Sequence, residues 1–130
     1  MNIYKKVLAA GMVGILMSPF LAQAADGNWK KGRIYYRMVC TACHKDHAGG
    51  AIPPSTQTIA EWKAYIKADS HAKGKDKVSY YVSKEYRESI KATNKAAAKF
   101  IKMPDASLLA DVKAFVVHGA KDSDNPARCN

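Results

Sequence analysis

The chain has 130 residues, of which 48% are hydrophobic and 25% are charged, a composition that excludes a disordered tail, a fibre and a pair of ordinary domains. Its 21 lysine and arginine residues outnumber its 11 acidic residues and give a formal charge of +10, which favours acidic partners. Three cysteines are too few for a disulfide framework, so their spacing is more informative than their number.

Residues 1–24 have the pattern of an export signal. Lys5 and Lys6 precede an apolar stretch, 7–20, that glycine and proline interrupt, and Ala22 and Ala24 supply the small residues of a cleavage site. We therefore expect a cleaved signal peptide rather than a membrane helix. Residues 25–130 then form one domain that carries a formal charge of +8, because the segment removed holds two lysines and no acidic residue. This domain is expected in the periplasm, without stable membrane insertion.

A first helix is expected to begin after Asn28, whose side chain is of a type that caps helices. Trp29, Gly32 and Tyr36 recur at helical spacing and place one face inward. The Gly-Gly and Pro-Pro pairs at 49–54 break regular structure further along the chain.

Between these features lies the sequence Cys40-Thr41-Ala42-Cys43-His44. CxxCH is the attachment motif for c-type haem. Two thiols on one helical turn can reach the two vinyl groups of one porphyrin, and the histidine that follows lies under the iron. The motif therefore predicts one covalently bound haem c, held by Cys40 and Cys43, with His44 as the proximal iron ligand.

Two other chemistries use a CxxC pair. A thioredoxin-like redox site explains neither the adjacent His44 nor the export signal. A zinc site could recruit His47 as a fourth ligand, but four ligands within eight residues are crowded compared with the usual zinc spacings. Haem attachment is the interpretation that accounts for all of these features.

Helical patterns continue after the motif. Thr58 and Glu61 form a capping box for a helix that places Trp62 on its inner face, and residues 69–77 form a polar loop. The next helix is expected at 83–100, with its cationic side chains, Arg87 among them, pointing to water.

A last helix is expected after Met103-Pro104, capped by Asp105 or Ser107 and ended by Gly119. Residues 120–130 should form a polar tail. No alternating pattern is long enough to predict a strand, so the fold class is all-α.

Residues at both ends of the domain resemble the class I c-type cytochromes. That family has a glycine eight residues before the first haem cysteine and an aromatic residue four before it, which Gly32 and Tyr36 match. The last helix of that family carries an acid, an aliphatic and an aromatic residue that pack against this glycine. Asp111, Val112 and Phe115 have the same residue types at the same spacing.

The resemblance implies a cytochrome c-like fold of about four to five helices around one covalently attached haem. Met103, in the loop before the last helix and followed by proline, would be the distal iron ligand, and the carbonyl of Pro53 or Pro54 would orient His44. His71 is the alternative distal ligand.

Two further histidines are weaker alternatives at the distal position. His47 should stay on the proximal side because it follows His44 by three residues, and His118 lies at the end of the last helix.

The same resemblance implies an electron carrier rather than an enzyme. With histidine and methionine on the iron, no position is open to substrate, and the haem passes single electrons between redox proteins. Lys45 and Lys102 could steer partners with acidic docking surfaces, whereas nucleic acid is an improbable partner. The alternative is a haem enzyme or a small-ligand sensor whose distal position is open or labile. Cys129, near the end of the chain, is expected to play no part in this chemistry.

Overall fold

The computed structural model describes residues 26–47 and 49–128. Within these residues the chain forms helices joined by loops and no strand, which confirms the all-α class. The export signal expected at 1–24 and the cysteine at position 129 lie outside the described residues. None of the helices described is long and apolar enough to cross a membrane.

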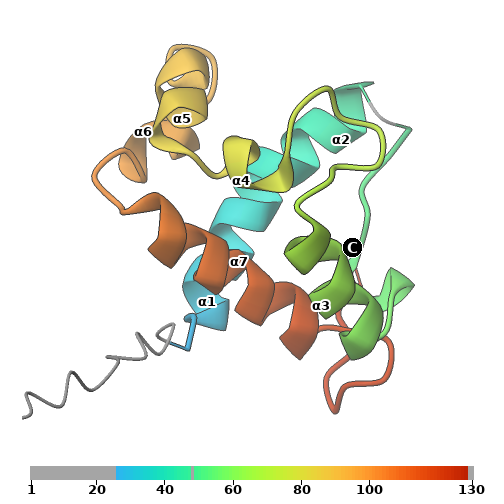
Figure 1. Ribbon diagram of the computed structural model, residues 1–130. Helices are drawn as coiled ribbons and strands as arrows, with labels where there is room; N and C mark the ends of the chain where they lie inside the picture. The colour runs from blue at the N-terminus through green and yellow to red at the C-terminus, as the bar shows by residue number, and fades with distance from the viewer. Residues whose placement is uncertain (1–25, 48, 129–130) are drawn as a thin grey trace, which may run out of the picture.

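The first helical run begins at α1 (Trp29–Tyr35), continues through a π-helical turn, η1 (Tyr36–Cys40), and ends with α2 (Thr41–His47) (Figure 1). Asn28 caps α1 as predicted, because its side chain accepts hydrogen bonds from the backbone amides of residues 30 and 31. In the π-helical turn, the Thr41 N–H bonds to the carbonyl five residues back, at Tyr36. Such widened turns are frequent at functional sites. This one ends at Cys40.

The run packs against α7 (Asp105–His118), and α1 and α7 form the most extensive helix pair of the fold (Figure 1). A Cβ atom added to Gly32 would lie 1.9 Å from the Asp111 carbonyl oxygen, so only glycine allows this approach. The Asn28 N–H also donates to the buried Asp111 carboxylate, at 2.6 Å. The packing expected between Gly32 and the last helix is thus confirmed.

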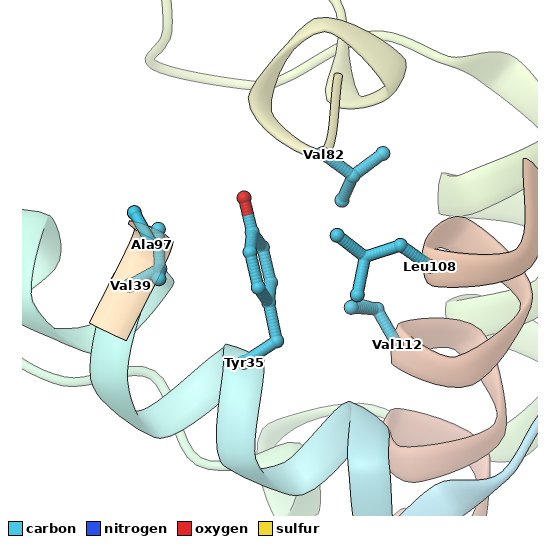
Figure 2. Close-up of a cluster of buried hydrophobic side chains, with 6 residues drawn as sticks. All are labelled: Tyr35, Val39, Val82, Ala97, Leu108 and Val112. Atoms are coloured by element: carbon cyan, nitrogen blue, oxygen red, sulfur yellow. The ribbon is translucent and has the colours of Figure 1, made fainter. Parts of the chain in front are cut away.

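One hydrophobic cluster surrounds Tyr35. Figure 2 shows this ring between Val39 and Ala97 on one side and Val82, Leu108 and Val112 on the other. The Tyr35 hydroxyl group donates to the Tyr81 carbonyl at 2.7 Å, which satisfies the one polar group of the ring in this cluster.

A second cluster joins α3 (Ile59–Ala68) to the end of α7 and consists of Trp62, Phe115, Val116 and Ala120. The capping box predicted at the start of α3 is present in full. A short 3-10 helix, η2 (Pro54–Thr56), precedes α3.

The single helix expected at 83–100 is wrong. The structure has two short helices there, α5 (Lys84–Ile90) and α6 (Lys95–Lys99), and another short helix, α4 (Val78–Tyr81), precedes them. Asn94 explains the break between α5 and α6, because its side chain caps α6 by accepting from the amides of residues 96 and 97. An asparagine that bonds to nearby backbone in this way competes with a continuous helix.

The exposure expected for Arg87 is also wrong, since its side chain is fully buried. Its Nε donates to the Ser83 carbonyl and its Nη1 to the carbonyls of Phe100 and Met103, while Nη2 pairs with the Asp105 carboxylate. The planar guanidinium group thereby fixes the segment that leads into α7.

The same contacts correct the predicted cap of α7. Pro104 occupies the N-cap position, and Asp105 is the first residue inside the helix rather than its cap. Its carboxylate accepts from the Lys84 N–H and pairs with Arg87, so it joins α7 to α5.

Replacing Arg87 by methionine is expected to lower the free energy of unfolding by about 2–3 kcal/mol, because buried carbonyls lose their donor. Urea unfolding of the purified protein measures this loss. The control is Lys91→Met, which breaks a surface ion pair with Glu88 and should cost about 0.5 kcal/mol or less. Equal losses in the two variants would show that the buried guanidinium group is not structural.

The polar tail expected after Gly119 is in fact docked as far as residue 127. The Ala127 N–H donates to the Gly119 carbonyl at 2.8 Å, and the Ala127 carbonyl accepts from the Ser55 N–H at 3.2 Å. Asp122 accepts from the Ile59 N–H at 2.7 Å. The segment therefore closes the fold against the loop before α3.

Candidate functional site

The residues of the CxxCH motif lie at the junction of η1 and α2. Cys40 is the last residue of η1, and Cys43 and His44 follow within the first turn of α2. Residues three or four apart on a helix share a face, so the thiols at positions 40 and 43 lie on the same side of this run. Both thiols are free, and the Cys43 side chain is exposed.

This face forms one wall of a cavity of about 370 Å³, a volume within the range of small-molecule and cofactor pockets. Its walls come from the helical run, α3, the 69–77 loop, α4 and α7. Both hydrophobic clusters contribute to it. The side chains most relevant to a ligand are Cys40, Cys43, His44, Trp62, Tyr65, His71, Tyr81, Val82, Tyr86, Val112 and Val116.

The 69–77 loop lies beside α2 and carries His71 to the cavity (Figure 1). The rings of His44 and His71 are 5.6 Å apart between centroids and inclined by 42°. The Nδ1 atoms of both rings are buried, and neither has a hydrogen-bond partner. Two half-buried imidazoles therefore lie close together, each with a buried nitrogen atom that makes no hydrogen bond.

Burial sets the protonation of both histidines. It lowers the pKa of His44, which the neighbouring His71 lowers further, and it lowers the pKa of His71. Both imidazoles are accordingly neutral at pH 7. A neutral imidazole is the form that binds a metal ion.

The Cys40 thiol has the opposite character to a reactive cysteine. Burial raises its pKa to about 12, so it is a protonated thiol at neutral pH. Catalytic and redox-active CxxC sites need a lowered pKa that supplies a thiolate. Cys40 thus contributes a protonated thiol to the cavity wall. No group of three or more metal-ligating side chains occurs among those the structure describes.

Met103 does not line the cavity. It is half-buried against the cluster around Tyr35, and its carbonyl accepts a hydrogen bond from Arg87 at 3.0 Å. The structure therefore does not bring Met103 together with His44. It brings His71 there instead.

The other histidines and the prolines have separate roles. The His118 ring stacks on Trp29 with centroids 4.1 Å apart, and the side chain of His47 is not described. The Pro53 carbonyl accepts from Thr56 and the Pro54 carbonyl from the Trp62 indole. Because the Nδ1 of His44 has no partner, neither proline carbonyl makes the orienting bond that the family resemblance implied.

Several residues of the cavity could not be predicted from the sequence. Val78 and Val82 line the cavity from the start and end of α4, a helix too short to show a periodic pattern. The sequence places Gly74 in a polar loop but does not predict its contact with His71. A Cβ atom at position 74 would lie 2.6 Å from the Nδ1 of His71.

Comparisons with models of protein families, with curated proteins and with solved structures find no match to this chain. The site's chemistry must therefore be argued from its own residues.

Proposed function

We propose that the protein is an exported monohaem c-type cytochrome with a cytochrome c-like fold, which carries single electrons between redox proteins. The observation that supports this most strongly is the position of the motif. Cys40, Cys43 and His44 lie together at the wall of an aromatic cavity.

The residues present fit a haem. Thioether bonds form from thiols, and neither Cys40 nor Cys43 is in a disulfide bond. The cavity offers apolar and aromatic surface for the porphyrin, and the neutral His44 has a buried nitrogen without a protein partner. When bound, the haem supplies an iron that changes between two oxidation states.

The aromatic side chains around the cavity would contact the haem. Trp62 is fixed by the hydrogen bond from its indole to the Pro54 carbonyl, at 2.7 Å. Tyr36 is fixed by its own bond to the Ile52 carbonyl, at 2.6 Å. Burial raises the pKa of Tyr86 to about 12, so its phenol stays neutral. Rigid walls of this kind keep the structural change small on electron transfer.

The charge of the surface suits transient partners. Lys73 and Lys75 line the cavity and are exposed, and Lys45 is exposed one residue after His44. Positive charge at the edge of a redox site accelerates encounters with acidic surfaces, and salt weakens the effect.

An electron carrier and a haem enzyme or small-ligand sensor differ in access to the iron. For a carrier, redox titration of the purified exported protein is expected to give a reversible one-electron curve, and the reduced protein should bind carbon monoxide slowly and weakly at pH 7. Rapid, tight binding would contradict the carrier and support a sensor or enzyme. The positive control is carbon monoxide binding to reduced protein in a chemical denaturant, which frees the distal position.

A further inference from the structure

We infer that His71, rather than Met103, is the second axial ligand, so that the haem of the proposed cytochrome is held between two histidines. The inference rests on the proposed function, because it concerns the iron of that haem. It assigns a ligand from the 69–77 loop, which is distant in sequence from the motif.

The spacing of the two rings suits a shared metal ion. Metal–nitrogen bonds to histidine are about 2 Å long and each nitrogen lies about 1 Å from its ring centre, so imidazoles on opposite sides of one ion have centroids about 6 Å apart. The His44 and His71 centroids are 5.6 Å apart.

In both rings the Nδ1 atom is buried and makes no hydrogen bond. A buried polar atom without a partner is rare in folded proteins, and an absent ion is one physical explanation for it. Since no hydrogen bond to the protein holds either ring at this atom, both imidazoles are available to bind a metal ion placed between them.

The loop is built to hold His71 in place. The His71 carbonyl accepts from the Gly74 N–H at 3.2 Å, and the centroid of the His71 ring lies 5.0 Å from that of the Tyr81 ring. The Ala72 N–H donates to the Tyr65 hydroxyl group at 3.2 Å. A Cβ atom at position 74 would lie 2.6 Å from the Nδ1 of His71 and 2.8 Å from the Tyr81 hydroxyl group, so glycine lets the loop pack closely against both side chains where they now lie.

The base of the same loop is closed by Asp69. This residue ends α3 in the left-handed conformation, with φ at 51°. Its carboxylate accepts from the Ser79 N–H and hydroxyl group, both at 2.7 Å, which ties the two ends of the loop together. His71 therefore lies in a loop whose two ends are joined by hydrogen bonds.

Met103 lies outside the lining of the cavity. The buried guanidinium group of Arg87 binds the Met103 carbonyl and the carbonyl of Phe100 three residues earlier. These bonds fix the backbone at position 103, and the Met103 side chain packs against the cluster around Tyr35 and does not line the cavity, whereas His71 already lines it.

Optical spectra of the oxidised, purified holoprotein test the inference. The protein and its Met103→Ala variant should both lack the weak far-red charge-transfer band of an iron–methionine bond, and both should remain low-spin. His71→Ala should become high-spin and bind carbon monoxide at least 10-fold faster after reduction, and added imidazole should restore the low-spin spectrum. His71→Met provides a second variant and should acquire the far-red band.

The outcomes separate the inference from the function. Covalent haem with a far-red band that disappears in Met103→Ala overturns the inference and leaves the proposed cytochrome intact. Covalent haem that stays low-spin in both Ala variants also overturns the inference, with Lys73 as the cavity residue to examine next. Protein without covalent haem overturns the proposed function and the inference together.

Discussion

A variant with both motif cysteines replaced, Cys40→Ala with Cys43→Ala, is expected to reach the periplasm without covalent haem and without a stable fold. The haem would fill the cavity that is lined by residues of the two hydrophobic clusters and of the 69–77 loop. Without the haem, the apolar and aromatic side chains that line this cavity of about 370 Å³ would lose the group that covers them and would be exposed to water, which is unfavourable. The whole stability of a small domain is about 5–15 kcal/mol.

The double variant should therefore lose stability as well as the haem. Haem-free protein is expected to lose most of its cooperative thermal unfolding transition and to be degraded faster, as measured by calorimetry and by limited proteolysis. Cys129→Ala removes the third cysteine of the chain and is the matched control, expected to keep haem and stability. A double variant that unfolds with the same cooperativity as the wild type would show that the cavity needs no occupant.

Gly32→Ala is expected to destabilise the protein by about 3 kcal/mol, the upper part of the range for overpacked cores. The new methyl group would lie 1.9 Å from the Asp111 carbonyl oxygen and 2.4 Å from its carbon. These are backbone atoms of α7, so no side chain can rotate away. The helices must separate, and the bond from the Asn28 N–H to the Asp111 carboxylate, at 2.6 Å, is strained with them.

Helix propensity alone predicts the opposite sign. In an exposed helix, replacing glycine by alanine stabilises by about 1 kcal/mol. The calibrating variant is Ala64→Gly, at an exposed position in α3, which should cost about that amount. Chemical denaturation of the holoproteins measures both. A Gly32→Ala protein as stable as the wild type, or more so, would show that α1 and α7 do not meet at this glycine.

Local signals in the sequence were sufficient for the parts of the fold that depend on neighbours in the chain. The Asn28 cap, the Thr58 capping box and the end of α7 at Gly119 each depend on one or two residues and their own backbone. These predictions are confirmed because capping is a local interaction.

Predictions failed where distant contacts decide the structure. Arg87 has the spacing of an exposed helical residue, but carbonyls from another segment bind its guanidinium group. The tail after Gly119 is polar, yet its backbone pairs with residues 55–57. Neither pairing leaves a periodic signal, because each depends on chain segments that meet only in the folded protein.

The candidate site divides in the same way. The motif places two thiols and His44 on one helical turn, and this local juxtaposition could be predicted. The position opposite His44 depends on how the 69–77 loop folds back, which involves Gly74, Tyr65 and Tyr81. A methionine followed by proline suggested Met103, but its side chain packs against the cluster around Tyr35 and does not line the cavity.

Intact mass spectrometry of the native protein purified from the periplasm tests the central claim most directly. Denatured in acid, the chain should have the mass of residues 25–130 plus one haem, with the added mass confined to the peptide that contains Cys40 and Cys43. A mass equal to the polypeptide alone, with both thiols open to alkylation, would contradict covalent haem attachment and the function that depends on it.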